Sequence, residues 1–295
     1  MTKLRTIILF LAIALTFTFA LAPKAGAQAQ PGKFYVVSTG PAGPELATLK
    51  AIDTMKTADL VLCPPRTAKT FQAYLRGKKV QDPWKKLWSY QGKIWMKDLA
   101  TFPPAERPKI VAQKSRERDA FVQKMKVLLK QGKSIALLDG GDPTIFSRAF
   151  WLLKGLNPEQ VEIIPGVGAY TASMAALKKA GTGGGARFVL QTAPFAFFGK
   201  KDRDDLAQAL SRFNGTLVFY MGLAQIKDLV DTLKKFNPGD LPVAVVYYAG
   251  YPQKQRVVKG TLDNILARIA PEKEKWLGMI IVGRAITGPS FILSK

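Results

Sequence analysis

The sequence has no histidine and a single cysteine among its 295 residues. Without histidine, the chain cannot build a Ser-His-Asp or Cys-His catalytic set, an imidazole zinc site or a histidine-ligated haem. A lone Cys63 excludes an intramolecular disulfide and a metal site made of several cysteines. We therefore expect no metal site in this protein.

Acidic residues are also scarce: 21 Asp and Glu stand against 44 Lys and Arg, which gives a formal net charge of +23. What the chain does have is apolar material, with 47% hydrophobic residues and 17 Phe, 8 Tyr and 5 Trp. That is enough to bury a sizeable core, so the composition excludes a disordered basic tail protein. The length predicts one or two domains.

The N-terminus has the order of an export signal. Lys3 and Arg5 precede an uncharged apolar run at 7–22, and an Ala-Gly-Ala triplet ends at Ala27. We expect a signal peptide over 1–27, an exported, periplasmic mature protein, and no membrane span after cleavage. The alternative is an uncleaved anchor, although the run of 16 residues is shorter than the roughly 20 residues of a comfortable span.

The rest of the chain alternates between short β-branched runs and segments with helical spacing, which is typical of α/β folds. The predicted strands are 34–39, 59–63, 134–138, 161–164, 187–191, 216–220, 242–248 and 278–282.

Two helices are predicted from spacing and end signals. One runs from about Arg116 to Lys130. The other starts at Pro44, whose fixed φ suits a first helical turn. Its apolar positions, which we expect in the core, are Leu46, Leu49 and Ile52.

Three predicted strands end in turns of small residues that open helices: STGPAGPE (38–45), DGGDPTIFSR (139–148) and PGVGAYTASMAAL (165–177). In an open α/β sheet, ligands bind off the carboxyl ends of strands. The first turn fits neither a dinucleotide nor a Walker fingerprint. Glycines in the second turn allow a ligand to approach the backbone, and Asp142 offers a carboxylate. The alternative is that these turns are structural, with Asp142 capping the next helix.

The order of these segments, followed by GTLVFYMGL and PVAVVYYAGYPQKQRVVKGTL, resembles the tetrapyrrole (corrin/porphyrin) methylase family. Members transfer methyl groups from S-adenosylmethionine to precorrins and uroporphyrinogen. The first half is most similar to enzymes acting on carbon 20 of precorrin-2, and AVVYYAGYPQ resembles the precorrin-4 type.

The resemblance implies an α/β fold of two domains, at 33–154 and 155–295, with S-adenosylmethionine in the cleft between them. Glycines would allow backbone contact with this cofactor, and apolar side chains would form its walls. The implied cofactor-binding residues are Pro41, Gly140, Gly141, Asp142, Ile145, Gly168, Ala169, Met221 and Ala249.

The sequence also departs from the family pattern. The loop at 38–43 reads STGPAG where members show Gly-x-Gly-Pro-Gly-Asp. Some members carry an aspartate base just after the second strand, and Cys63 stands at that place here. The catalytic residues are therefore left unassigned.

The segment at 76–133 holds 16 Lys and Arg against 5 Asp and Glu, a local charge of +11. Within it, 77–113 is rich in Trp and Pro and predicts a long surface excursion. A basic surface with aromatic rings suits an acidic tetrapyrrole. The alternatives are a solvated basic face or a patch for anionic lipid or nucleic acid. The residues expected to bind substrate are Lys85, Lys86, Lys93 and Lys97, with stacking on Trp84, Trp88 or Trp95.

The leading hypothesis is an S-adenosylmethionine-dependent tetrapyrrole C-methyltransferase with no nucleic acid partner; a homodimer is compatible with it. The export signal favours a second hypothesis, because S-adenosylmethionine is a cytoplasmic metabolite: an exported tetrapyrrole-binding protein that does no chemistry. A third is a methylase acting on RNA or a modified peptide.

Export predicts a defined N-terminus. Because the small-residue triplet ends at Ala27, N-terminal sequencing of the secreted fraction should begin at Gln28. Full-length protein retained in membranes would instead identify the apolar run as an anchor.

Overall fold

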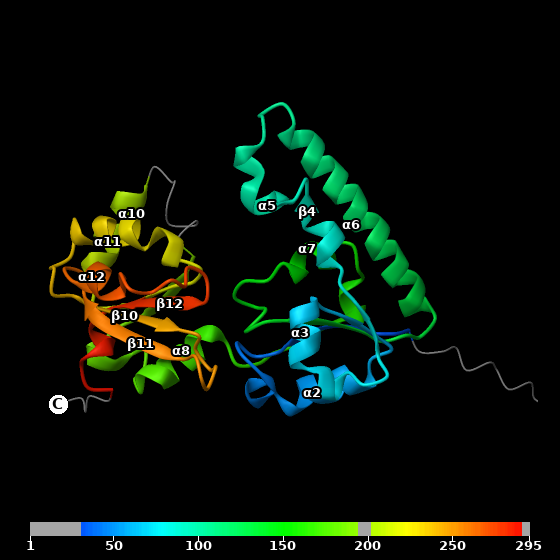
Figure 1. Ribbon diagram of the computed structural model, residues 1–295, viewed down its shortest axis with the longest axis horizontal. Coiled ribbons are helices and arrows are strands. Elements are labelled where there is room, and N and C mark those ends of the chain that lie inside the picture. Colours follow the sequence, from blue (N-terminus) through cyan, green and yellow to red (C-terminus); the bar gives the residue numbers. More distant parts are fainter. Residues whose placement is uncertain (1–30, 194–201, 291–295) are drawn as a thin grey trace, which may run out of the picture.

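The computed structural model describes residues 31–193 and 202–290, which form two α/β lobes (Figure 1). The expected signal peptide at 1–27 lies outside these residues. Within the described ranges, no helix is long and apolar enough to cross a membrane.

The N-terminal lobe is built on a five-stranded parallel sheet with the order β3-β2-β6-β1-β7. Four of its strands match the prediction. The fifth, β3, was missed because its three residues are exposed and carry no apolar alternation. The strands are β1 (Phe34–Ser38), β2 (Leu60–Leu62), β3 (Lys79–Gln81), β6 (Ile135–Asp139) and β7 (Val161–Ile164).

Helices cover both faces of this sheet, because successive side chains of each strand point to opposite sides. Val36 and Leu137 pack toward α6 and α7, whereas Val37 and Leu138 pack toward α2 and the segment around Phe71. The helices are α2 (Leu49–Thr57), α3 (Pro65–Thr70), α6 (Arg107–Lys130) and α7 (Ala149–Leu153).

The first helix begins later than expected. Pro44–Leu46 form only a 3-10 turn, and α2 starts after Thr48, whose hydroxyl accepts a hydrogen bond from the Ala51 N–H at 3.1 Å. The predicted core position of Leu49 is wrong, since this side chain lies in the first turn and is 84% exposed. Ile52 is buried, as predicted.

Helix α6 also differs from the expected range. It begins at Arg107 rather than Arg116, and Pro108 lies in its first turn, where a missing N–H costs no intrahelical hydrogen bond. Met125 and Leu129 of this helix are buried against the sheet.

The C-terminal lobe has a second five-stranded sheet, with the order β11-β10-β12-β9-β8. Only β8 and β9 run parallel, and the other pairs are antiparallel. Four strands match the predicted ones, and β11 was missed. The strands are β8 (Val189–Thr192), β9 (Thr216–Phe219), β10 (Pro242–Tyr247), β11 (Arg256–Thr261) and β12 (Gly278–Val282).

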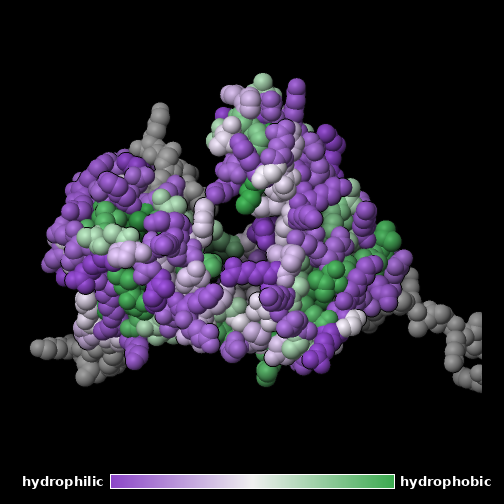
Figure 2. Space-filling model, viewed as in Figure 1, coloured by the Kyte–Doolittle hydropathy of each residue, from purple (hydrophilic) through white to green (hydrophobic). Residues whose placement is uncertain are grey.

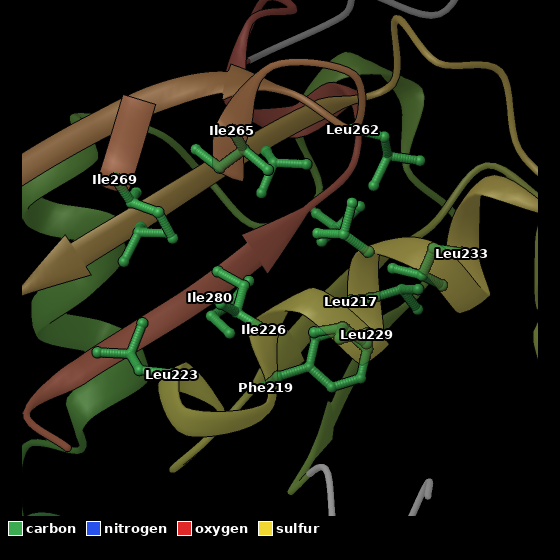
Figure 3. Packing of buried hydrophobic residues seen from close by; sticks show 14 of the residues in the cluster. Leu217, Phe219, Leu223, Ile226, Leu229, Leu233, Leu262, Ile265, Ile269 and Ile280 are labelled. Carbon is green, nitrogen blue, oxygen red and sulfur yellow. The ribbon is translucent and has the colours of Figure 1, made fainter. Parts of the chain in front are cut away.

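This second sheet is also covered on both faces (Figure 1). Figure 3 shows the larger core, where Phe219 and Ile280 of the strands meet Leu229 and Leu233 of the opposing helix. Its helices are α10 (Arg203–Ser211), α11 (Ile226–Lys234) and α12 (Ile265–Ile269), while α8 (Ala169–Leu177) packs on the other face.

The boundary between the lobes lies further along the chain than the expected position at 154/155. Strand β7 pairs with β1, with Val161 opposite Phe34, so it belongs to the N-terminal sheet. The first element that packs on the C-terminal sheet is α8, which begins at Ala169. Because β7 pairs with a strand far away in the sequence, the boundary between the lobes lies in the segment after Ile164.

Residues 84–106, which we call the protrusion, extend from the N-terminal lobe beside α6 (Figure 1). The surface excursion predicted at 77–113 therefore has secondary structure of its own. The elements of the protrusion are α4 (Trp84–Leu87), β4 (Ser89–Tyr90), β5 (Lys93–Ile94) and α5 (Trp95–Asp98).

Tryptophan rings hold the protrusion to the lobe. Trp84 and Trp95 are only 5% and 4% exposed. Trp88 lies between them and Trp151 of α7, with ring centroids 5.6–6.4 Å apart. The Trp95 indole N–H donates to the Leu87 carbonyl at 3.0 Å. The expectation that Trp84 and Trp95 stack on a ligand is wrong, because these rings are used as core.

This burial predicts a large loss of stability on truncation of Trp84. We expect Trp84→Ala to lower the free energy of unfolding by about 3–5 kcal/mol, through lost transfer energy and a cavity. The matched control is Trp276→Ala, because Trp276 is 53% exposed. Urea unfolding followed by circular dichroism measures both, and equal small losses would contradict the packing role of Trp84.

Candidate functional site

The loops after β1 and β6 are joined by hydrogen bonds. The Gly141 N–H donates to the Gly40 carbonyl at 2.8 Å, and the Ser38 hydroxyl donates to the Gly141 carbonyl at 2.5 Å. β1 and β6 are neighbouring parallel strands, so their carboxyl ends emerge side by side. These bonds fix the two loops as one surface.

Glycine is required in these loops on two grounds. Gly40 and Gly141 have φ of +73° and +74°, a conformation that other residues rarely adopt. At Gly40, a Cβ would also lie 2.6 Å from the Leu46 carbonyl oxygen. The third loop packs as closely, since a Cβ on Gly166 would lie 2.3 Å from the Ser38 hydroxyl.

The C-terminal lobe contributes the residues just after β9 and β10. Met221 and Tyr248 have φ of +53° and +49°, although neither is glycine. Such backbone conformations cost free energy of roughly 1–3 kcal/mol each and gather at functional sites. Both residues line the same cavity as the glycine loops, so the strain lies where the two lobes face each other.

The cavity has a volume of about 410 Å³ and is open to solvent. The N-terminal lobe supplies Thr39 to Ala42, Arg66, Phe71 and the glycine pair, and the C-terminal lobe supplies the opposite wall. The predicted cofactor residues that line it are Pro41, Gly140, Gly141, Ala169, Met221 and Ala249. Three other predicted cofactor residues do not line it: Asp142, Ile145 and Gly168.

Asp142 is engaged in its own loop. One carboxylate oxygen accepts hydrogen bonds from the Thr144 N–H at 2.9 Å and from the Thr144 hydroxyl at 2.7 Å. This is the turn-stabilising role that the sequence left open as the alternative. A Cβ on Gly168 would lie 3.2 Å from the Asp142 Cβ, so the second and third loops are in close contact here.

Sequence reasoning missed several residues that line the cavity. Ser173, in the middle of α8, is fully buried, and its hydroxyl has no hydrogen-bond partner among the described residues. Among the described residues that line the cavity, Arg66 is the only one with a charged side chain. Ser173 lies inside α8 and Arg66 inside α3, so the rule for loops directly after strands, which located the glycines, had no signal for them.

Two tyrosines of the lining are held by defined partners. The Tyr220 hydroxyl donates to the Gln191 side-chain oxygen at 2.6 Å, and burial raises the pKa of Tyr220 to about 12. The Tyr248 hydroxyl donates to Glu274, which raises the pKa of Tyr248. Both phenols therefore remain neutral donors at physiological pH.

Glu274 also fixes the loop before β12. Its second oxygen accepts the N–H groups of Trp276 and Leu277 at 2.6 and 3.0 Å. The bond from the Tyr248 hydroxyl and these backbone bonds lower the pKa of Glu274 to about 2. One carboxylate thus positions the exposed ring of Trp276, which lines the cavity.

The four lysines expected to bind substrate lie in different surroundings. Lys97 lies opposite the C-terminal lobe, with its ammonium nitrogen 4.0 Å from the ring centroid of Trp276. Lys93 stays within the protrusion, where it donates to the Thr101 hydroxyl at 3.1 Å. Lys85 and Lys86 are in α4. None of the four lines the cavity itself.

Other titratable groups follow the N-terminal strands. Burial raises the pKa of the Cys63 thiol to about 11, so this residue is a protonated thiol at neutral pH. Burial also raises the pKa of Asp139, which accepts a hydrogen bond from Ser147. Among the described residues, no group of three His, Cys, Asp or Glu could hold a metal ion.

The Tetrapyrrole (Corrin/Porphyrin) Methylases family profile matches residues 33–266. A uroporphyrinogen-III C-methyltransferase of Methanocaldococcus jannaschii is 30% identical over 266 residues, covering 86% of this chain and 97% of that protein. A precorrin-4 C(11)-methyltransferase of Mycobacterium tuberculosis is 34% identical over 209 residues, covering 68% and 81%. The chain belongs to the tetrapyrrole methylase family.

Solved structures agree with the fold. A cobalt precorrin-4 methyltransferase superposes with a TM-score of 0.64 at 21% identity, covering 90% of this chain and 99% of that chain. A uroporphyrin-III C-methyltransferase from Thermus thermophilus, complexed with S-adenosyl homocysteine, gives 0.56 at 24% identity, covering 86% and 99%. The expected two-domain methylase-like fold is confirmed.

The hydrogen bonds of Glu274 predict a dependence of stability on pH. Its folded pKa of about 2 lies below the unfolded value of about 4.3. The stabilisation is therefore present above about pH 4.3 and lost as the pH falls toward 2. Because water screens the carboxylate, we expect Glu274→Gln to cost less than about 1 kcal/mol at neutral pH.

The measurement is urea unfolding at about pH 7 and about pH 3, where Glu274→Gln should lose less stability on acidification than the wild type. Asp59 also has a pKa lowered to about 2, through hydrogen bonds from Ser134. Asp59→Asn removes this second contribution and keeps that of Glu274, so adding Glu274→Gln to it should reduce the acid dependence further. An unchanged acid dependence in Glu274→Gln would refute this role.

Proposed function

We propose that the protein is an S-adenosylmethionine-dependent methyltransferase that acts on a tetrapyrrole of the precorrin or uroporphyrinogen type. One observation carries the proposal: loops at the carboxyl ends of β1 and β6 and residues after β9 and β10 converge on one cavity. The relatives named above are C-methyltransferases acting on uroporphyrinogen-III and precorrin-4.

The residues of the cavity fit S-adenosylmethionine. The cavity volume of about 410 Å³ lies within the range of about 300–1,000 Å³ usual for small-molecule sites. Gly140 and Gly141 leave their backbone open to polar groups of a ligand, and Phe71 and Met221 offer apolar walls. The Ser173 hydroxyl, which has no hydrogen-bond partner in the described part of the chain, would gain one. The cofactor, when bound, supplies an electrophilic methyl group.

The residues of the chain act mainly by binding and orientation. Cys63 stands where some family members carry a base, and its pKa of about 11 keeps it protonated and unable to accept a proton at neutral pH. Holding two reactants in line is sufficient for large rate gains, with effective molarities on the order of 10⁵ M or more. The two lobes supply this alignment by facing each other across the cavity.

A basic substrate-binding region supports the tetrapyrrole as substrate. The segment at 76–133 carries the local charge of +11 noted above. It includes the protrusion, and Lys97 of the protrusion reaches a ring that lines the cavity. A carboxylate-bearing macrocycle is attracted to a surface of this sign.

The second candidate is an exported tetrapyrrole-binding protein without catalysis. Its support is the N-terminal order of residues 1–27, together with the protonated thiol at Cys63. Export to the periplasm is part of both proposals. Calorimetry of the mature protein separates them, because a carrier would bind the macrocycle and not S-adenosylmethionine.

The proposed function predicts that blocking the cavity abolishes cofactor binding. We expect Ala249→Phe to weaken S-adenosylmethionine binding at least about tenfold, which is about 1.4 kcal/mol, because Ala249 lines the cavity. The control is Ala120→Phe, at an exposed position of α6. Isothermal calorimetry measures affinity, and thermal melts check folding. Equal affinities in a folded Ala249→Phe variant would place the cofactor elsewhere.

A further inference from the structure

Ser173 differs from the other buried hydroxyl residues in helices. Its side chain is fully buried, and its hydroxyl is the one buried side-chain polar atom of the described residues without a hydrogen-bond partner. Thr54 of α2 and Thr232 of α11 are also buried, and they donate to the carbonyls four residues earlier at 2.7 and 2.8 Å. Ser173 makes no such bond to the Ala169 carbonyl of its own helix. A hydroxyl buried in this way lowers the stability of the fold.

Ser173 belongs to the wall of the cavity that the C-terminal lobe supplies. The cavity lies between the two lobes, where Figure 2 shows a hollow beneath the protrusion. Ala169 and Ser173 are one turn apart on one face of α8, and both line the cavity. Helix α8 packs on β10 and β12, where Val246 and Met279 are paired in register, are buried and line the cavity as well. Ser173 thus adds a hydroxyl to an apolar part of the wall.

Charge separates this wall from the opposite one. Arg66 is on the N-terminal wall, and it makes no ion pair within the described ranges. A carboxylate is costly to place among apolar side chains without a cation, so the amino-acid end of S-adenosylmethionine belongs beside Arg66. Adenine is uncharged and flat, and its edge carries ring nitrogens and an amino group that form hydrogen bonds. An apolar wall with one free hydroxyl suits this end of the cofactor.

We propose that the Ser173 hydroxyl binds the adenine of the cofactor, and that it makes the free protein less stable than an alanine at this position would. In the complex, the hydroxyl bonds a polar atom at the edge of the adenine ring. In the free protein, the same hydroxyl has lost its hydrogen bonds to water on folding and has gained none in return. This inference rests on the proposed function, since it assigns one part of the cofactor to one wall of the same cavity.

The first test measures the stability of the free protein. Ser173→Ala should raise the melting temperature by about 2–4 °C, because it removes the hydroxyl and adds no volume. Alanine also favours the helix more than serine or threonine does. The control for this effect is Thr171→Ala, at an exposed position of α8 that does not line the cavity. A gain in Ser173→Ala no larger than in Thr171→Ala, or a loss, would overturn the inference, since the hydroxyl would then have a partner in the folded protein.

The second test measures affinity by calorimetry with S-adenosylhomocysteine and 5′-methylthioadenosine. The two probes share the adenosine group, and only the first carries the amino-acid end. Ser173→Ala should weaken the binding of both about three- to tenfold, whereas Thr171→Ala should leave both within about twofold. Arg66→Gln should show the reverse pattern: a loss of about three- to tenfold for S-adenosylhomocysteine and an unchanged affinity for 5′-methylthioadenosine.

Unchanged affinity of Ser173→Ala for both probes would overturn the inference and leave the proposed methyltransferase intact, since other residues would then bind the adenine. A loss in Ser173→Ala confined to S-adenosylhomocysteine would also overturn it, because the hydroxyl would then contact the amino-acid end. If the wild type bound neither probe, the proposed function would fall and the inference with it. Binding of both probes by the wild type keeps the proposed function, whatever the result for Ser173→Ala.

Discussion

The site depends on the hydrogen bonds that join the end of β1 and the loop after it to the loop after β6. Gly141 donates to Gly40, and the Ser38 hydroxyl donates to Gly141. These bonds form because two neighbouring parallel strands end together and because both glycines adopt a positive φ. With any larger residue at Gly40, the loop would collide with the Leu46 carbonyl. The joined loops form part of the N-terminal wall of the cavity.

The opposite wall is held by different means. Met221 and Tyr248 keep a positive φ without being glycine, and Tyr248 is tied to Glu274 through its hydroxyl. The same carboxylate holds the Trp276 backbone. A single charged group therefore positions an aromatic ring at the cavity and helps to hold a strained residue of the lining. The C-terminal lobe uses side-chain hydrogen bonds where the N-terminal lobe uses glycine.

The tryptophans divide between two tasks according to their burial. Trp84 and Trp95 close the core beneath the protrusion, and an arginine, Arg148, lies 4.4 Å from the ring centroid of Trp84. Among the tryptophans of the described residues, only Trp276 lines the cavity, and its side chain is exposed. Burial of the first group anchors the protrusion to the N-terminal lobe, and the protrusion carries Lys97 to Trp276. Packing within the N-terminal lobe thus supports the Lys97–Trp276 contact with the C-terminal lobe.

The sequence by itself determined the α/β class, the eight main strands and the small-residue loops, because period-2 runs and glycine turns are local signals. It could not determine β7 as a strand of the first lobe, since that requires pairing with β1 across more than a hundred residues. Burial of Trp84, burial of the Ser173 hydroxyl and the contact of Lys97 with Trp276 were likewise decided by tertiary structure. Each is a contact between segments far apart in the chain, and local spacing carries no information about such contacts.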